Sequence, residues 1–528
     1  MRHATAIAIL ILASAAAPQD RGRDAQLKAC FEEAMKAASV IKSDYLQSDV
    51  MSEIAEVQGR AGWAKDALET IEAMTYDYHK SLAYAYAARE LGKVGKVKEA
   101  REILERGMTS TDDGDKDFKT GNAYGHIATV FAQIGDFDRA IKIASPGAGG
   151  WGPDSFAMRN IATLLAQSGD IARAIKMVPE DEYRPPPWVL FEAARDLLKE
   201  GKTRNVPEII AGIDDANLRS SARLEYAKTL AAKSMWDDAA RVAEAITDDD
   251  DRIEAFADLG IARAKAGQPL DEARLRTAEG LLGRLTTPYD KVEARLQLAR
   301  WKAAVRDPAG ASKLAEAARV FTAEITDWPE GARIRVACTF AEIGAHDRAL
   351  ELAGQLPENS QGTAFQNIAS ALYQQGDRKR FEEVLGRVTS PFQVAMACFK
   401  AAQVEIQRGA KDEARRLLRR SFEDLDKIDV GFTSLNDVRN GTDEWSLLHD
   451  LLEAQAKVGD FEGARATGLK GEKDQRGGQY GGAIARRLAR FETKAERLEE
   501  ALVWIRKLKD PMSRTLAYVG AAEGLIDR

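Results

Sequence analysis

One glycine recurs along the chain at nearly constant spacing, and this repeat restricts the possible folds more than any other feature. The segments IATVFAQIGDFDRAIKIA (127–144) and IATLLAQSGDIARAIKMV (161–178) match closely, 34 residues apart. We call the position of this recurring glycine the repeat landmark. Seven of the eleven intervals between successive landmarks are 32 to 34 residues, which indicates a chain of equal structural units. The landmark positions are Gly62, Gly95, Gly135, Gly169, Gly201, Ser234, Gly267, Arg306, Gly344, Gly376, Gly409 and Gly459.

Two columns of small residues accompany the landmarks at fixed distances. Seven residues before a landmark stands an alanine such as Ala128, and five residues after it another such as Ala140. Alanine permits helix axes to approach to about 8 Å, and glycine permits the left-handed backbone of a tight turn. Each unit is therefore predicted to be a helix, a tight turn and a second helix, and no alternating strand pattern of useful length occurs.

These features resemble the tetratricopeptide repeat family. The resemblance rests on the 34-residue period, the small residue of the first helix, and turns such as GDFDRA (135–140) and GDFEGA (459–464), and it covers most of the chain. The aromatic residues usual in that family are mostly Leu or Ala here. The resemblance implies an all-α fold, a right-handed α-solenoid of about 12–13 antiparallel helix-turn-helix repeats.

The first residues have the pattern of a secretory signal. A charged start at Met1–His3 precedes an apolar run and a group of small residues at Ser14–Ala17. We therefore expect an exported protein, periplasmic or extracellular, with no stable membrane span once the signal is removed. The expected organisation is a secretory signal peptide (1–17), an N-terminal helix or cap (18–48), TPR-like repeats (49–422), an irregular insertion (423–445), and C-terminal repeats with a capping helix (446–528).

The tripeptide Gly201-Lys202-Thr203 ends like a phosphate-binding loop, but its context differs. Asp196 stands where the first glycine of that loop is needed, and Gly201 falls on the repeat landmark. The three cysteines and five histidines show no metal-ligand spacing. We therefore expect no catalytic residues, no cofactor and no metal.

A mostly polar column lies six residues before each landmark and is predicted to line the concave face of the solenoid. Its basic members favour an acidic protein or peptide partner. A net charge of -7 disfavours nucleic acid as the partner. The predicted partner-binding residues are Arg89, Arg159, Asn160, Thr163, Arg195, Lys228 and Arg300.

The sequence thus predicts an exported, non-catalytic TPR-like scaffold that binds protein or peptide partners on its concave surface, with cell-envelope assembly as one such role. One alternative stays open. A carbohydrate-active or other enzyme built on an α-helical repeat toroid would carry paired carboxylates in a few unit-specific positions.

Overall fold

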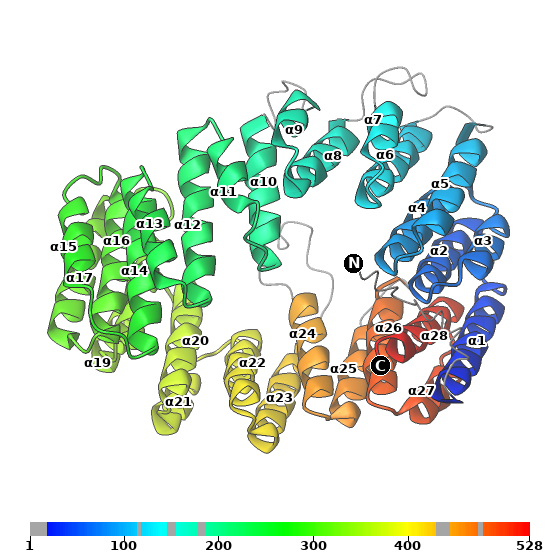
Figure 1. Cartoon of the computed structure of the whole chain (residues 1–528). Helices are drawn as coiled ribbons and strands as arrows, with labels where there is room; N and C mark the ends of the chain where they lie inside the picture. Colours follow the sequence, from blue (N-terminus) through cyan, green and yellow to red (C-terminus); the bar gives the residue numbers. More distant parts are fainter. Residues whose placement is uncertain (1–17, 113–117, 145–154, 178–185, 429–443, 474–478) are drawn as a thin grey trace, which may run out of the picture. The chain divides into compact units, whose positions relative to one another are not determined.

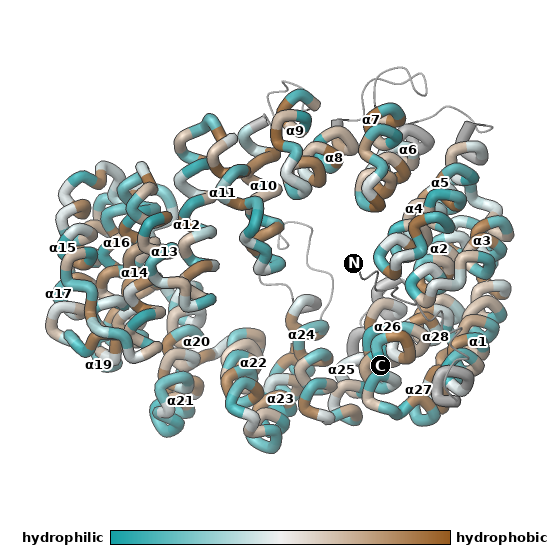
Figure 2. Tube along the Cα trace, in the orientation of Figure 1, coloured by the Kyte–Doolittle hydropathy of each residue, from teal (hydrophilic) through white to brown (hydrophobic). Residues whose placement is uncertain are grey.

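In the computed structural model, the described part of the chain is α-helical with one short 3₁₀ helix and no strand (Figure 1). This confirms the all-α prediction. Within the helices, hydrophilic and hydrophobic residues alternate, as expected where one face is buried (Figure 2). The structure describes residues 18–112, 118–144, 155–177, 186–428, 444–473 and 479–528.

The chain forms two compact units, and the first combines early and late parts of the sequence. Unit 1 contains the residues up to Arg106 together with Phe461–Arg528. Its helices are α1 (Pro18–Ala38), α2 (Asp44–Arg60), α3 (Ala64–Glu72), α4 (Asp77–Lys93), the first part of α5 (Val97–Asp112), α25 (Phe461–Lys473), α26 (Gln479–Lys494), α27 (Leu498–Ile505) and α28 (Pro511–Ile526).

Unit 2 spans Gly107–Asp460 and stacks helical pairs in chain order. Each first helix contacts the first helix of the next pair, and its own second helix packs behind it. The first helices are α6 (Phe118–Gln133), α8 (Ser155–Ser168), α10 (Pro186–Lys199), α12 (Ala216–Ala232), α14 (Asp249–Lys265), α16 (Pro288–Ala304), α18 (Pro329–Glu342), α20 (Glu358–Gln375), α22 (Pro391–Arg408) and α24 (Glu444–Lys457). The second helices are α7 (Phe137–Ala144), α9 (Ile171–Met177), α11 (Val206–Ala211), α13 (Trp236–Glu244), α15 (Glu272–Leu281), α17 (Pro308–Phe321) with η1 (Thr322–Glu324), α19 (His346–Gly354), α21 (Arg378–Leu385) and α23 (Lys411–Asp426).

The repeat landmarks are turns with left-handed backbone. All ten landmark glycines have φ between 70° and 100°, and Ser234 and Arg306 adopt the same region at 59° and 64°. Glu496, with φ 65°, supplies a thirteenth turn between α26 and α27. Gly201 is one of these turns and joins α10 to α11, so the Gly-Lys-Thr tripeptide is a repeat turn, as predicted.

The alanine columns are the contact points of the helical pairs. Every alanine of both columns is at most 2% exposed. The thirteenth unit follows the same rule, since Ala489 and Ala501 are fully buried seven residues before and five residues after Glu496. Gly260 departs from alanine because a Cβ there would lie 2.0 Å from the ring of the buried Trp301. The repeat units are therefore TPR-like helical pairs.

The last helix, α28, lies inside unit 1. It contacts α26 as well as α1 and α2, and thirteen of its residues are buried. A Cβ on Gly520 would lie 1.9 Å from the backbone oxygen of Arg486, so α26 and α28 approach closely there. The sequence predicts a capping helix at this position, and a cap would present a polar face to solvent. Instead α28 is covered by helices from both parts of the sequence.

Some expectations fall outside the described residues. These include the whole predicted signal, 1–17, and most of the predicted insertion at 423–445. Of that insertion, the first residues belong to α23, which continues to Asp426. None of the described helices is both long and apolar enough to cross a membrane.

Candidate partner-binding groove

Four consecutive first helices of unit 2, α16 to α22, line a groove of about 940 Å³. Their groove-facing residues stand nine, six and two positions before each repeat turn. This i, i+3, i+7 spacing places them on one face of each helix. We call this face the first-helix face. In the groove, the column nine positions before each turn contains Arg335, Asn367 and Lys400. The column six positions before the turn contains Arg300, Cys338, Ser370 and Gln403. The column two positions before the turn contains Glu342, Gln374 and Gln407.

Two of the groove's cations, Arg300 and Arg335, are held by carboxylates of neighbouring helices, and a third, Arg408, pairs with Glu405 of its own helix at 3.0 Å. The Arg300 guanidinium donates to Glu342 at 2.6 Å and to the Thr339 hydroxyl at 2.9 Å. Arg335 donates to Glu293, a buried residue on α16, and to the Tyr289 hydroxyl. These pairs join neighbouring helices and fix where both guanidinium groups lie.

Lys400 differs from these three arginines because it pairs with no carboxylate in the described part of the chain. Its ammonium donates to the Asn367 side-chain oxygen at 3.1 Å. Burial in the groove lowers the pKa of Lys400, and the neighbouring Cys338 opposes this shift. A half-buried ammonium whose partner is a neutral amide is incompletely compensated. An incoming anion would find here a cation that no acidic side chain already neutralises.

Amide side chains occupy the rest of the groove. Gln374, Gln403 and Gln407 are exposed, and their side-chain atoms make no hydrogen bond with other described residues. Each amide offers two donors and one acceptor. Such groups can pair with the backbone of an extended segment laid across the helices.

The groove also contains a thiol, Cys338, on α18. Burial raises the pKa of this thiol to about 12, with Glu342 adding to the shift. It is therefore protonated at neutral pH and lacks the thiolate that nucleophilic chemistry needs. Cys338 is free, as are the buried Cys30 and Cys398.

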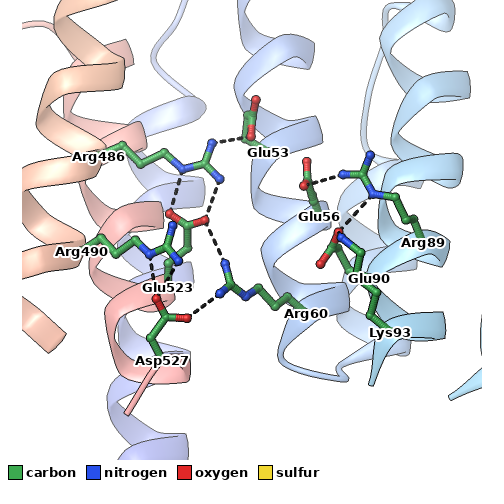
Figure 3. A network of polar contacts seen from close by, with 10 residues as sticks. All are labelled: Glu53, Glu56, Arg60, Arg89, Glu90, Lys93, Arg486, Arg490, Glu523 and Asp527. Atoms are coloured by element: carbon green, nitrogen blue, oxygen red, sulfur yellow. Dashed lines mark hydrogen bonds and ion pairs between the residues drawn. The ribbon is translucent and has the colours of Figure 1, made fainter. Parts of the chain in front are cut away.

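In unit 1 the first-helix face carries a network of ion pairs instead (Figure 3). Arg486 on α26 bonds to Glu53 on α2 at 2.5 Å and to both oxygens of Glu523 on α28. Arg60 on α2 reaches Glu523 at 3.5 Å and Asp527 at 2.5 Å. The network contains five cations and five carboxylates (Figure 3). The cations are Arg60, Arg89, Lys93, Arg486 and Arg490, and the carboxylates are Glu53, Glu56, Glu90, Glu523 and Asp527.

The residues predicted to bind a partner are distributed over both units. Arg89 belongs to unit 1, where it donates to Glu56 at 2.8 Å. Lys228 contacts three carboxylates, Glu254 closest at 2.8 Å. Arg195 pairs with Glu192 of its own helix at 3.3 Å.

The remaining predicted residues lie on α8 and α16. The Thr163 hydroxyl donates to the Arg159 backbone oxygen, and Asn160 lies between them on α8. Arg300 alone of the seven predicted residues lines the groove. Their role in binding stays a prediction.

The groove residues missing from the sequence prediction include Arg335, Asn367, Lys400 and Arg408, and also Glu342, Gln374 and Gln407. Three of them stand nine residues before a repeat turn, one helical turn from the predicted column. The residues nine positions before each turn form a second column, and this column was the signal available in the sequence. Sequence spacing does not show which of these charges already have partners on neighbouring helices.

Comparisons with known proteins assign this chain to no family. No family model matches the chain, and no curated protein matches it. Among solved structures, the Cut9–Hcn1 assembly of the APC/C is 14% identical with a TM-score of 0.25, and the match covers 97% of this chain and 94% of that one. The pentatricopeptide repeat protein PPR10 from maize is 13% identical with a TM-score of 0.28, and the match covers 90% of this chain and 69% of that one.

A third similar structure is a monomeric IFIT1 mutant with Gppp-AAAA. It is 13% identical with a TM-score of 0.25, over 85% of this chain and 95% of that one. Identities and TM-scores of this size carry nothing about partners. The class of this protein, an α-helical repeat protein of the TPR-like type, follows from its own turns and alanine columns.

Proposed function

We propose that this protein is a non-catalytic scaffold that binds an extended, acidic segment of a partner protein in the groove of α16 to α22. The observation that carries the proposal is the half-buried Lys400 ammonium, held by the Asn367 amide and by no carboxylate of the described residues. A carboxylate of the partner would complete this contact. It would also raise the pKa of Lys400, because an opposite charge favours the ammonium form.

The other groove residues fit the same ligand. Arg300 and Arg335 are positioned by Glu342 and Glu293, so little side-chain entropy is lost when a ligand binds beside them. The exposed glutamines can accept and donate bonds to peptide groups. Cations therefore select acidic side chains, and amides bind the backbone whatever its sequence.

A scaffold role is favoured over catalysis by the chemistry present. Within the described residues, no group of three or more His, Cys, Asp or Glu side chains could hold a metal ion. The thiol of Cys338 in the groove is protonated and therefore a poor nucleophile. A protein partner is favoured over nucleic acid because the whole chain has a net charge of -7, which repels a phosphate backbone.

We further propose that the protein acts outside the cytoplasm, because residues 1–17 have the sequence pattern of a secretory signal. Binding of an envelope or secreted partner would follow from that location.

A displayed library of random peptides tests the binding proposal. Wild-type protein is expected to select acidic peptides, whose affinities are then measured by fluorescence anisotropy for wild type and for Lys400→Glu. Charge reversal should weaken binding at least about tenfold, because the ligand's carboxylate then faces another carboxylate. Lys379→Glu on α21 is the matched control, since that side chain is 88% exposed and lies outside the groove.

Two outcomes would contradict the proposal. One is selection of neutral or apolar peptides by the wild type. The other is equal affinity of the acidic peptides for Lys400→Glu and Lys379→Glu. Tighter binding of single-stranded RNA than of any selected peptide would favour a nucleic-acid partner instead.

A further inference from the structure

Unit 1 is assembled from two segments that are far apart in the sequence. We call residues 18–106 the early segment and 461–528 the late segment. The compact unit 2, 107–460, lies between them along the chain. The contacts that join the two segments, formed by α1 and α2 with α26 and α28, are called the junction.

The junction contains a buried apolar layer and, beside it, ion pairs between the two segments. The α1 side chains Leu27, Cys30 and Phe31 are at most 4% exposed, and α1 contacts α28. Beside this apolar layer, Arg486 reaches Glu53 across 433 positions of sequence, and Arg60 reaches Asp527 across 467. Each ion pair thus has one member in each segment.

Neither segment buries its own surface without the other. Thirteen residues of α28 are buried, among them Tyr518, Val519 and Leu525 at 2% exposure or less. In helical-repeat proteins a terminal unit normally has a polar outer face that keeps the stack soluble. Here α28 is covered by early-segment helices on the side where such a face would be. The late segment therefore requires an early segment as its cover.

Nothing in the described junction depends on both segments belonging to one molecule. Its ion pairs and helix contacts join residues of the early segment to residues of the late segment. Exchange of an identical element between copies is a general route to dimers, because it reuses contacts that the monomer already makes. Within one chain, the junction is favoured by a high effective concentration of the two segments.

We propose that the junction also forms between two copies of this chain, the late segment of each copy packing against α1 and α2 of the other. The partner is a second copy and the surface is the junction itself. The resulting dimer carries two grooves, so it would bind a partner with repeated acidic segments more tightly than the monomer does. The exchange is independent of what the groove binds.

A charge-complementation experiment on the full chain tests the exchange. The variant Arg486→Glu places a carboxylate against its own Glu53, and the variant Glu53→Arg places a guanidinium against its own Arg486. Each variant alone therefore has two like charges in its own junction, which destabilise the closed monomer.

The two variants are then co-expressed with different tags. In an exchanged dimer, one junction pairs the two substituted side chains, which have opposite charges, and the other pairs the wild-type Arg486 and Glu53. Both junctions thereby regain opposite charges at positions 53 and 486. We expect the two tags to co-purify in a species of twice the monomer mass by light scattering. Its yield should be at least about tenfold that from two tagged copies of one variant.

The double variant Arg486→Glu with Glu53→Arg in one chain is the control, because its own junction is complementary. If this control folds as a monomer and the mixed variants co-purify no better than two copies of one variant, the proposal is overturned.

If the control does not fold, two differently tagged wild-type copies decide the question. They are unfolded and refolded together at rising concentration. A dimer fraction that grows with concentration and persists on dilution supports exchange. Monomer alone at every soluble concentration contradicts it.

Discussion

The first-helix face serves two different purposes in the two units. In unit 1 its columns carry Glu53, Glu56 and Arg60, and these charges pair with side chains of α4, α26 and α28. In the groove of unit 2 the same columns carry the ion-paired Arg300 and Arg335 together with amides and Lys400, and Lys400 has no carboxylate partner among the described residues. The repeat fixes where a residue points, and the neighbouring helices decide whether it stabilises the fold or is left to bind a ligand.

The largest expected effect concerns the close approach of helices in unit 1. In Gly520→Ala the new Cβ would lie 1.9 Å from the backbone oxygen of Arg486, and a backbone atom cannot rotate away. We expect a loss of about 3 kcal/mol or more in the free energy of unfolding, measured by urea denaturation with far-UV circular dichroism.

Gly280→Ala in α15 of unit 2 is the control, because its Cβ would meet open space. Replacing glycine by alanine inside a helix should raise stability there by about 0.5 kcal/mol. Equal effects of the two substitutions would show that α26 and α28 are not closely packed.

The second prediction compares a cation that pairs with the first-helix face of α2 in unit 1 with a cation on that face in unit 2. Arg486→Ala leaves Glu53 without its partner and weakens the hold on Glu523, and the Arg486 side chain is only 21% exposed. We expect a loss of about 2 kcal/mol in unfolding free energy. Lys400→Ala should cost less than about 0.5 kcal/mol, because no ion pair is broken.

The same urea denaturation measures both variants. A stability loss at Lys400 as large as that at Arg486 would mean that Lys400 is a structural residue. The first-helix face would then stabilise the fold in both units, and the difference between unit 1 and the groove would be lost.

The smallest expected effect is a pH dependence of stability that differs between the two units. Burial and neighbouring carboxylates raise the pKa of Asp250 to about 7 and of Asp251 to about 6 at the start of α14. A carboxyl with a raised folded pKa binds its proton more tightly in the folded state. Its contribution to stability therefore increases as pH falls from about 7 toward its unfolded value near 3.9.

In unit 1 the pKa of Glu90 is lowered. Burial opposes this shift, but hydrogen bonds from Lys93 and Arg89 exceed it. Its contribution is present above the unfolded value and is lost as pH falls through the folded pKa. On lowering the pH from about 7.5 to about 5, the opening free energy from hydrogen exchange, corrected for the intrinsic exchange rate at each pH, should therefore rise at α14 by about 1 kcal/mol or less, given solvent screening, and stay unchanged at α4.

Asp250→Asn with Asp251→Asn should abolish the response at α14. A response that persists in this double variant would assign it to other groups.

The repeat made most of the fold predictable. The landmark glycines forecast the left-handed turn inside each repeat from Gly62 to Gly459, and Ser234 and Arg306 keep that backbone without being glycine, whereas the left-handed Trp328 before α18 lies outside the repeat pattern. The N-caps at Asp248 and Thr287 are equally local, since each side chain accepts from the backbone of the following turn. These features are local, so spacing along the chain is enough to find them.

The contacts between distant segments were not predictable in this way. Nothing in the spacing shows that α28 meets α1, because their sequences are separated by almost the whole chain. The candidate site was only partly foreseen for the same reason. Arg89 and Lys228 are basic and correctly phased, but Glu56 and Glu254 on neighbouring helices neutralise them. Pairing depends on side chains one repeat away, which a single column does not show.

The central claim is that the groove of α16 to α22 binds a partner while the same face of unit 1 is occupied by its own ion pairs. Hydrogen–deuterium exchange with and without a selected acidic peptide tests it most directly. We predict new protection at the groove-lining ends of α18, α20 and α22, and no change at α2, α26 and α28. Protection confined to the unit 1 helices, with none in the groove, would contradict the account.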